Sequence, residues 1–399
     1  MFTNVKNILF TFVKKFSFML HLANLHKEDQ IFGRYITNEM IIPLLHKHQK
    51  NSVQKIEGYS VLGQPIYSIE IGSGKTKILM WSQMHGNEVT TTKGFFDFLN
   101  FLFSKEALAE SILTNYTIKC IPILNPDGAK AYTRVNANGI DLNRDAFEIS
   151  QPESKLLRSL LLEFNPDFAY NLHDQRTIFG TEGFMLPATI SFLAPAFDEN
   201  RTYNETRLKA IHIINKMNLA LQRVIPCQVG RFDDSFNINC IGDYATSIGI
   251  PTILFEAGHF QNDYQREEVR KMVFIALVSS FAKQTIDELT NDLEQYLKIP
   301  QNTKCFFDFI YRNIKIFVDN EEKLITFAAQ FEEELKSNAI EFEAKIVQIE
   351  NLEGYKGHFE FDAKQMVYSS KSGKFPKINQ KANFYLNNLL KFDNGMQLL

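Results

Sequence analysis

The segment "WSQMHGNEVTTTKGFF", residues 81–96, joins an apolar run to a stretch with helical character. It places His85 and Glu88 three positions apart, in a loop that follows a predicted strand. The strand ends of α/β proteins are where ligand-binding groups gather. Zinc prefers nitrogen and oxygen donors of this kind, and a hydrolytic zinc takes three protein ligands. The pair therefore predicts half of a metal site, although two polar surface residues would give the same local pattern.

Strand and helix patterns alternate on both sides of this segment. Residues 60–83 predict two strands around a Gly-Ser-Gly turn, and apolar strands are predicted again at 116–123, at 168–174 and in "GIPTILFEAGH" after Pro251. Helical patterns occupy 90–106, 151–164, 199–222 and 265–289. This alternation predicts an α/β fold with a mixed, largely parallel central sheet flanked by helices.

The pattern changes near residues 300–302. Beyond them "IEFEAKIVQIE" alternates, with Ile340, Phe342, Ala344 and Ile346 on one face, and "GHFEFDA" is a second strand candidate. We therefore expect an N-terminal helical extension over 1–50, a catalytic α/β domain over 51–300 and a small β-rich C-terminal domain over 303–399.

The totals limit the partners. The formal net charge is −3, which gives no basic field for nucleic acid or an anionic membrane. Lysines interrupt the apolar N-terminal stretch, so no integral membrane segment is expected there. The stretch predicts an amphipathic extension, and a weak signal sequence is the alternative. Four scattered cysteines without a CxxC motif favour a reducing, cytoplasmic compartment, and two disulfide bridges are the alternative.

Two further strand ends carry groups that would complete a hydrolytic site. His173 in "AYNLHDQ" is a candidate third metal ligand, and a core histidine is the alternative interpretation. Glu256 ends the apolar strand of "TILFEAGH", where a carboxylate is costly unless it has a partner or a function. It could act as a general base, or it could form a structural salt bridge.

The irregular stretch "NPDGAKAYTRVNANGIDLNRD", residues 125–145, brings together Arg134, Asn143 and Arg144. Two guanidinium groups and an amide can hold a carboxylate and polarise a carbonyl oxygen. Asp141 could accept a hydrogen bond from a metal-bound histidine. Asn, Asp and Gly are also what plain turns use.

Taken together and in this order, the HxxE pair, the "NPDG…R…GxDLNR" block, the His of "NLHD" and the Glu of "LFEAG" resemble the zinc carboxypeptidases, the carboxypeptidase A-like metallopeptidases. The resemblance covers about residues 56–285 and implies their fold and one Zn²⁺ ion. It implies that His85, Glu88 and His173 bind this ion.

The same resemblance implies the roles of the remaining residues. Glu256 would be the general base and acid in a water-promoted hydrolysis of an amide, and Arg134 would stabilise the oxyanion. Asn143 and Arg144 would hold the terminal carboxylate of the substrate, and Asp141 would orient a zinc-bound histidine.

The resemblance leaves three functions open. The first is a carboxypeptidase that removes a C-terminal residue from a peptide. The second is a deacylase of small N-acyl amino acids, similar to succinylglutamate desuccinylase or aspartoacylase. It is favoured by the segment 303–399 and by "VGRFDDSFNINCIGD", which lacks the substrate-capping Tyr of the carboxypeptidases. The third is a non-enzymatic binding protein. The absence of a metal ligand or of the catalytic Glu would indicate such a protein, but all of these residues are present in the sequence.

Overall fold

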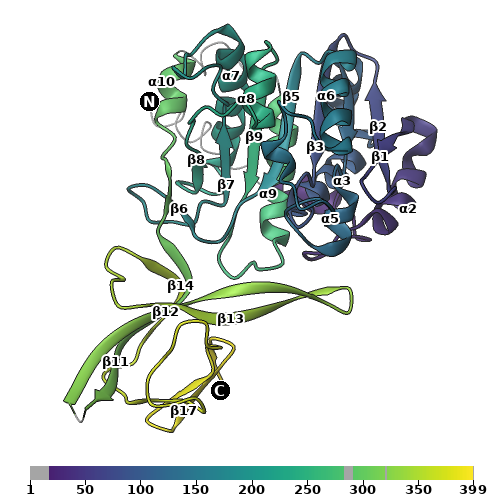
Figure 1. Cartoon of the computed structure of the whole chain (residues 1–399). Helices are drawn as coiled ribbons and strands as arrows, with labels where there is room; N and C mark the ends of the chain where they lie inside the picture. Colours follow the sequence, from purple (N-terminus) through teal and green to yellow (C-terminus); the bar gives the residue numbers. More distant parts are fainter. Residues whose placement is uncertain (1–17, 283–290, 320, 399) are drawn as a thin grey trace. The chain divides into compact units, whose positions relative to one another are not determined.

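The computed structural model describes residues 18–282, 291–319 and 321–398 of the chain. These residues form two compact units (Figure 1). Unit 1 comprises the described residues of Met1–Gln175 and Thr181–Asn302. Unit 2 comprises Arg176–Gly180 together with the described residues of Thr303–Leu399. Residues 1–17 of the predicted N-terminal extension and residues 283–289 of the predicted helix at 265–289 lie outside the described residues.

Unit 1 is built on one eight-stranded sheet. Its strand order is β1-β2-β4-β3-β5-β9-β7-β8. The central strands β4, β3, β5 and β9 run parallel, whereas β1, β2 and β7 join the sheet in antiparallel pairs. The prediction of a mixed, largely parallel sheet is therefore confirmed. The strands are β1 (Val53–Tyr59), β2 (Pro65–Gly72), β3 (Thr76–Ser82), β4 (Tyr116–Ile121), β5 (Phe168–Asp174), β7 (Ile190–Leu193), β8 (Val229–Arg231) and β9 (Thr252–Ala257).

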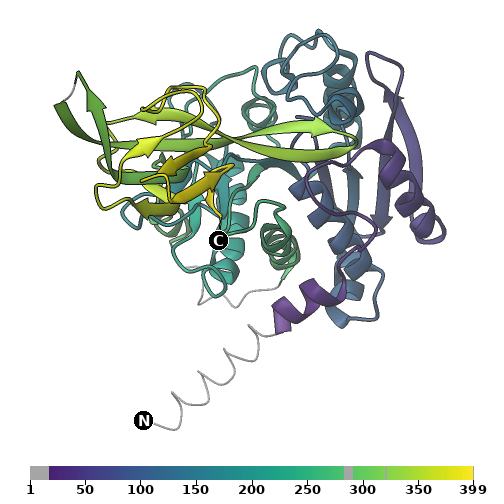
Figure 2. The ribbon, with the colours of Figure 1, turned by 90° about the horizontal axis from the view of Figure 1, so that it is seen from below.

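Helices cover both faces of this sheet, as Figure 2 shows from below. The alternation of β3 explains why, because Ile78 and Met80 pack into one apolar core while Leu79 and Trp81 pack into the other. A strand buried on both faces is what a parallel sheet between helical layers requires. The helices are α2 (Asn38–His48), α3 (Thr90–Leu102), α4 (Ala107–Asn115), α5 (Pro126–Ala131), α6 (Pro152–Phe164), α7 (Glu205–Leu221), α8 (Ile241–Ser247), α9 (Glu267–Phe281) and α10 (Asp292–Leu297), with 3₁₀ turns η1 (Gln49–Asn51) and η2 (Leu142–Arg144).

Two local features differ from the sequence-based expectation. The Pro-Asp-Gly segment is the first turn of α5 and not an isolated turn, with Asn125 as N-cap accepting a hydrogen bond from the Gly128 amide. Strand β1 was not expected, and it pairs antiparallel with β2 at the sheet edge. In the described residues no helix is both long and apolar enough to cross a membrane.

Unit 2 contains two antiparallel-rich sheets of four strands each. Aromatic side chains fill its core, with Phe384 stacked on Phe392 at a ring-centroid distance of 4.6 Å. The predicted alternation is present in β13, where Ala344 and Ile346 are buried. The strands are β11 (Phe306–Val318), β12 (Glu321–Lys336), β13 (Ala339–Ile349), β14 (Lys356–Asp362), β15 (Tyr368–Ser369), β16 (Phe384–Leu386), β17 (Leu390–Asp393) and β18 (Met396–Gln397), and β6 (Phe179–Thr181) pairs separately with β10 (Asn302–Lys304).

Candidate metal centre

The loop that carries His85 and Glu88 is held in an unusual backbone conformation. Gln83, directly after β3, has a positive φ of 43°, a region that non-glycine residues rarely adopt. Its side-chain amide donates hydrogen bonds to the carbonyl oxygens of Gly86 (2.9 Å) and Ile36 (3.1 Å). Strain of this kind persists only where the surroundings enforce it, and it is common at functional sites.

Gly86, between the two metal-ligand candidates, lies directly against α5. A Cβ at this position would be 1.9 Å from the carbonyl carbon of Gly128. Helix α5, whose sequence is also compatible with a turn, therefore packs directly against the loop that carries His85 and Glu88. Only glycine fits at this point of closest approach.

The end of the loop is fixed by β5 across the sheet. Helix α3 begins at Thr90, and the Asp174 carboxylate accepts hydrogen bonds from the Thr90 amide (3.0 Å) and hydroxyl (2.6 Å). The Asp174 amide in turn donates to Glu88 Oε2 at 3.2 Å. The threonines that begin this helical segment do not cap α3 themselves. The cap is instead a carboxylate 84 residues away, and it ties the HxxE loop to the strand that carries His173.

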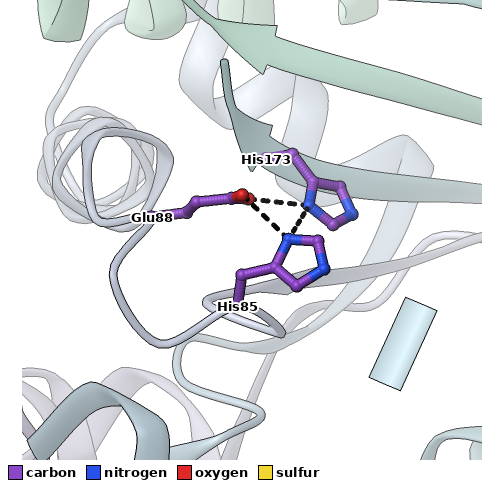
Figure 3. A group of neighbouring side chains, drawn as sticks. All are labelled: His85, Glu88 and His173. Carbon is purple, nitrogen blue, oxygen red and sulfur yellow. Dashed lines mark hydrogen bonds and ion pairs between the residues drawn. The ribbon is translucent and has the colours of Figure 1, made fainter. Parts of the chain in front are cut away.

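His85, Glu88 and His173 converge on one point, as Figure 3 shows. Glu88 Oε1 lies 2.8 Å from His85 Nδ1, and Glu88 Oε2 lies 2.8 Å from His173 Nδ1. The two Nδ1 atoms are 3.1 Å apart. Nitrogens bound to zinc at about 2.0–2.1 Å in tetrahedral geometry would be about 3.3 Å apart. The donor set and its spacing therefore fit zinc, with all three side chains buried.

Asp141 and Arg134 surround this cluster on the side of the 125–145 segment. Asp141 Oδ1 lies 3.0 Å from His85 Nε2, so a proton on Nε2 leaves Nδ1 free to bind a metal. Arg134 donates to Asp141 Oδ2 at 3.0 Å and to Glu88 Oε1 at 3.3 Å. Although burial opposes it, the neighbouring histidines hold the pKa of Glu88 well below its usual range.

Glu256 stands beside His173, because these residues are register partners on the parallel strands β9 and β5. Its Oε2 atom is buried and has no hydrogen-bond partner within the described part of the chain. Burial raises the pKa of Glu256 well above its usual value, and the charges of Glu88 and Asp174 raise it further. A buried carboxylate with a raised pKa is the expected character of a general base.

Asn143 and Arg144 lie on the 3₁₀ turn η2, directly after Asp141. The Asn143 amide nitrogen donates to Asp141 Oδ1 at 2.9 Å, and its side-chain Oδ1 accepts from the Ile241 amide at 3.1 Å. The Arg144 side chain is exposed, and its Nη1 donates to the Asn143 carbonyl oxygen and to Cys240 Sγ. All of the candidate site residues therefore fall in unit 1. His173 and Glu256 lie on central strands, and the remaining residues lie on the loop after β3 and on the 125–145 segment.

Sequence reasoning overlooked Asp174 and Gln83. Asp174 is the last residue of "NLHD", and its position after a strand-end histidine was an available signal. Its partner, the N-terminus of α3, could be found only from the fold. Gln83 gave no signal, because nothing in its local sequence indicates a positive φ.

The family resemblance is borne out by direct comparison. Residues 40–178 match the family model described as zinc carboxypeptidase. This segment, about a third of the chain, is therefore similar to the zinc carboxypeptidases. Carboxypeptidase SOL1 of Arabidopsis thaliana is 30% identical over 135 residues, which cover 29% of this chain and 28% of that protein. Cytosolic carboxypeptidase-like protein 5 of Danio rerio is 35% identical over 74 residues, 18% of this chain and 8% of that protein. The chain thus matches well under half of the length of each relative.

Solved structures extend the likeness to the fold. A metallo-carboxypeptidase from Burkholderia cenocepacia has a TM-score of 0.50 at 16% identity, covering 62% of this chain and 69% of that one. The carboxypeptidase A from Helicoverpa armigera also has a TM-score of 0.50, at 17% identity, covering 71% and 80%. The carboxypeptidase-like fold is therefore confirmed. Within it, His85, Glu88 and His173 form a cluster that could hold a metal ion.

Proposed function

We propose that this protein is a zinc-dependent metallocarboxypeptidase that hydrolyses the C-terminal amide bond of a peptide. The observation that carries the proposal is the convergence of His85, Glu88 and His173, with the Glu256 carboxylate on the adjacent strand. Three protein ligands and a neighbouring base are the arrangement that metal-assisted hydrolysis requires.

His85, Glu88 and His173 would hold one zinc ion. When bound, the ion would lower the pKa of a coordinated water and polarise the substrate carbonyl. Asp141 would keep the proton of His85 on Nε2, so that Nδ1 faces the ion. The matching of donor types and spacing to zinc supports this choice of metal.

Glu256 would move the proton in both halves of the reaction. Its raised pKa brings it closer to the operating pH than an exposed glutamate. It would accept a proton from the attacking water and then donate it to the leaving amine. Because Oε2 has no partner in the described part of the chain, this oxygen is available for that transfer.

Arg134, Asn143 and Arg144 would bind the substrate. Arg134 touches Glu88 and is 48% exposed at its side chain, so it reaches from the cluster to the solvent and could stabilise an oxyanion. Arg144 is exposed beside Asn143 and would grip the terminal carboxylate of the peptide.

A deacylase of small N-acyl amino acids is the second candidate, and the β-rich unit 2 favours it. Both candidates use the same ligand set and the same base. A non-enzymatic role is the third, and the presence of the cluster together with Glu256 argues against it.

The test compares two substrate sets with zinc-loaded protein, with and without a chelator. One set is blocked peptides with varied C-terminal residues, and the other is small N-acyl amino acids. Chelator-sensitive release of C-terminal residues supports the carboxypeptidase. Activity confined to the acyl amino acids selects the deacylase, and no chelator-sensitive hydrolysis in either set contradicts both.

A further inference from the structure

Arg134 and Arg144 differ in the partners that their guanidinium groups contact. Arg134 is already engaged by two carboxylates, those of Glu88 and Asp141. Arg144 forms no ion pair in the described part of the chain, and its Nη1 donates instead to the Asn143 carbonyl oxygen (2.7 Å) and to the thiol sulfur of Cys240 (3.1 Å). The exposed Arg144 side chain therefore makes no direct ion pair in the described residues, and its charge acts on Asp243 only at longer range.

The segment that carries Cys240 is firmly attached to the segment that follows Arg144. The Asn239 carbonyl oxygen accepts from the Ala146 amide at 3.1 Å, and Asn239 Oδ1 accepts from the Phe147 amide at 3.1 Å. The Asn143 side chain accepts from the Ile241 amide on the other side of Cys240. These hydrogen bonds hold the sulfur in a fixed position relative to η2, where it accepts a hydrogen bond from the Arg144 guanidinium group.

We propose that Cys240 is a positioning residue for carboxylate recognition: it holds Arg144 in place through an uncharged acceptor, so that the arginine charge stays available for an anionic substrate terminus. This inference rests on the proposed function and adds a residue that the family motifs do not include.

The chemistry of the thiol fits this role. A sulfur atom is a weak hydrogen-bond acceptor, and it orients the guanidinium group without neutralising it. Burial raises the pKa of Cys240 to about 11, even though the Arg144 charge acts in the opposite direction. The group is therefore a neutral thiol at physiological pH, and a carboxylate at the same place would compete directly with the substrate for Arg144.

The decisive comparison is between the variants Cys240→Asp and Cys240→Asn. The Asp and Asn side chains have nearly the same shape, but only Asp is charged. With zinc-loaded protein and blocked dipeptides as substrates, we expect the KM of Cys240→Asp to be at least tenfold higher than that of Cys240→Asn, with kcat much less affected. Cys240→Ser should stay close to wild type, whereas Cys240→Ala should raise KM roughly two- to tenfold because one hydrogen bond is lost. Cys227→Ser is the matched control, since Cys227 is another half-buried free cysteine of unit 1.

A binding measurement separates this inference from the proposed function. Calorimetric titration compares a blocked dipeptide with its C-terminal amide, on zinc-loaded wild type and on each Cys240 variant. We expect the wild type, Ser and Asn proteins to prefer the free carboxylate and the Asp protein to lose that preference. Equal KM and equal preference for Asp and Asn would overturn the role of Cys240.

Two further outcomes are also decisive. If wild type binds the carboxylate form selectively but hydrolyses neither substrate set, the proposed activity fails while the role of Cys240 stands. If Cys240→Asp does not fold, as judged by zinc content and melting temperature, the KM values of Cys240→Ala and Cys240→Ser are compared instead. Identical KM values for Ala and Ser would then reject the inference.

Discussion

Replacing Glu256 by Gln is expected to move stability and activity in opposite directions. The carboxylate Oε2 is buried without a hydrogen-bond partner in the described part of the chain, and its pKa is raised by burial and by the charges of Glu88 and Asp174. Gln has the same shape and no charge. In metal-free protein the substitution therefore removes an unfavourable charge, whereas in the loaded enzyme it removes the proposed base.

The cost of an unsatisfied buried group is about 1–3 kcal/mol for a neutral group and more for a charged one. Gln keeps the neutral part of this cost and removes the excess due to charge, so we expect a difference of about 1–3 kcal/mol. For a unit of this size that free energy corresponds to a rise in melting temperature of roughly 2–10 °C. A group whose folded pKa is raised stabilises the protein below its unfolded pKa, 4.5 for Glu, and loses that contribution as the pH rises. The advantage of Gln over Glu256 should thus be small near pH 4.5 and grow toward pH 8.

The assay is calorimetric unfolding of chelator-treated wild type and Glu256→Gln at pH 4.5, 6 and 8, together with zinc content and turnover of the loaded proteins. Turnover should fall by about 10²–10⁴-fold with zinc content unchanged. Full activity in Glu256→Gln would refute the assignment of the base. A variant that is less stable than wild type at pH 8 would refute the electrostatic reasoning.

Three further predictions concern other parts of the chain. His173→Ala should abolish stoichiometric zinc binding in equilibrium dialysis, and full occupancy would show that the ligand set is wrong. Gly86→Ala should destabilise unit 1 by about 1–3 kcal/mol and weaken zinc binding, because its Cβ would meet the backbone of Gly128. Gly58→Ala is the control, because its Cβ would lie 3.3 Å from the Leu156 side chain, which can move. In unit 2, burial lowers the pKa of His358 to about 4 from 6.5, so the unfolding free energy should fall by about 2 kcal/mol between pH 7.5 and pH 5, and His358→Gln should remove that dependence.

The ligand candidates could be predicted because they occupy the ends of apolar strands, and the carboxyl ends of parallel strands meet at one edge of a sheet. His173 and Glu256 illustrate this, being register partners although 83 residues separate them. Strand recognition and the rule for parallel sheets place these two strand ends at one edge of the sheet, whereas the choice of His173 as ligand and Glu256 as base came from the family resemblance. The mixed, largely parallel sheet followed from the same alternation.

Features that depend on distant contacts could not be predicted. Asn-Pro-Asp-Gly suits both a turn and the first turn of a helix, with Asn125 as N-cap and Pro126 at the first helical position. What favours the helix in the fold is its packing against Gly86, which the local sequence does not contain. The cap of α3 by Asp174 belongs to the same class.

The hydrogen bonds around the cluster explain why a cation suits this site better than a proton. With its proton on Nε2 toward Asp141, His85 presents a lone pair at Nδ1, 3.1 Å from His173 Nδ1 and 2.8 Å from Glu88 Oε1. A single proton on His173 Nδ1 can bond to one of these acceptors at a time, which leaves the other lone pairs facing one another. A divalent ion held by His85, Glu88 and His173 would satisfy all three donors at once and would also offset the charges of Glu88 and Glu256. The charges of Glu88 and Asp174 that raise the pKa of Glu256 in metal-free protein would also favour a cation at this site, so the proposed metal binding and the proposed base depend on one electrostatic arrangement.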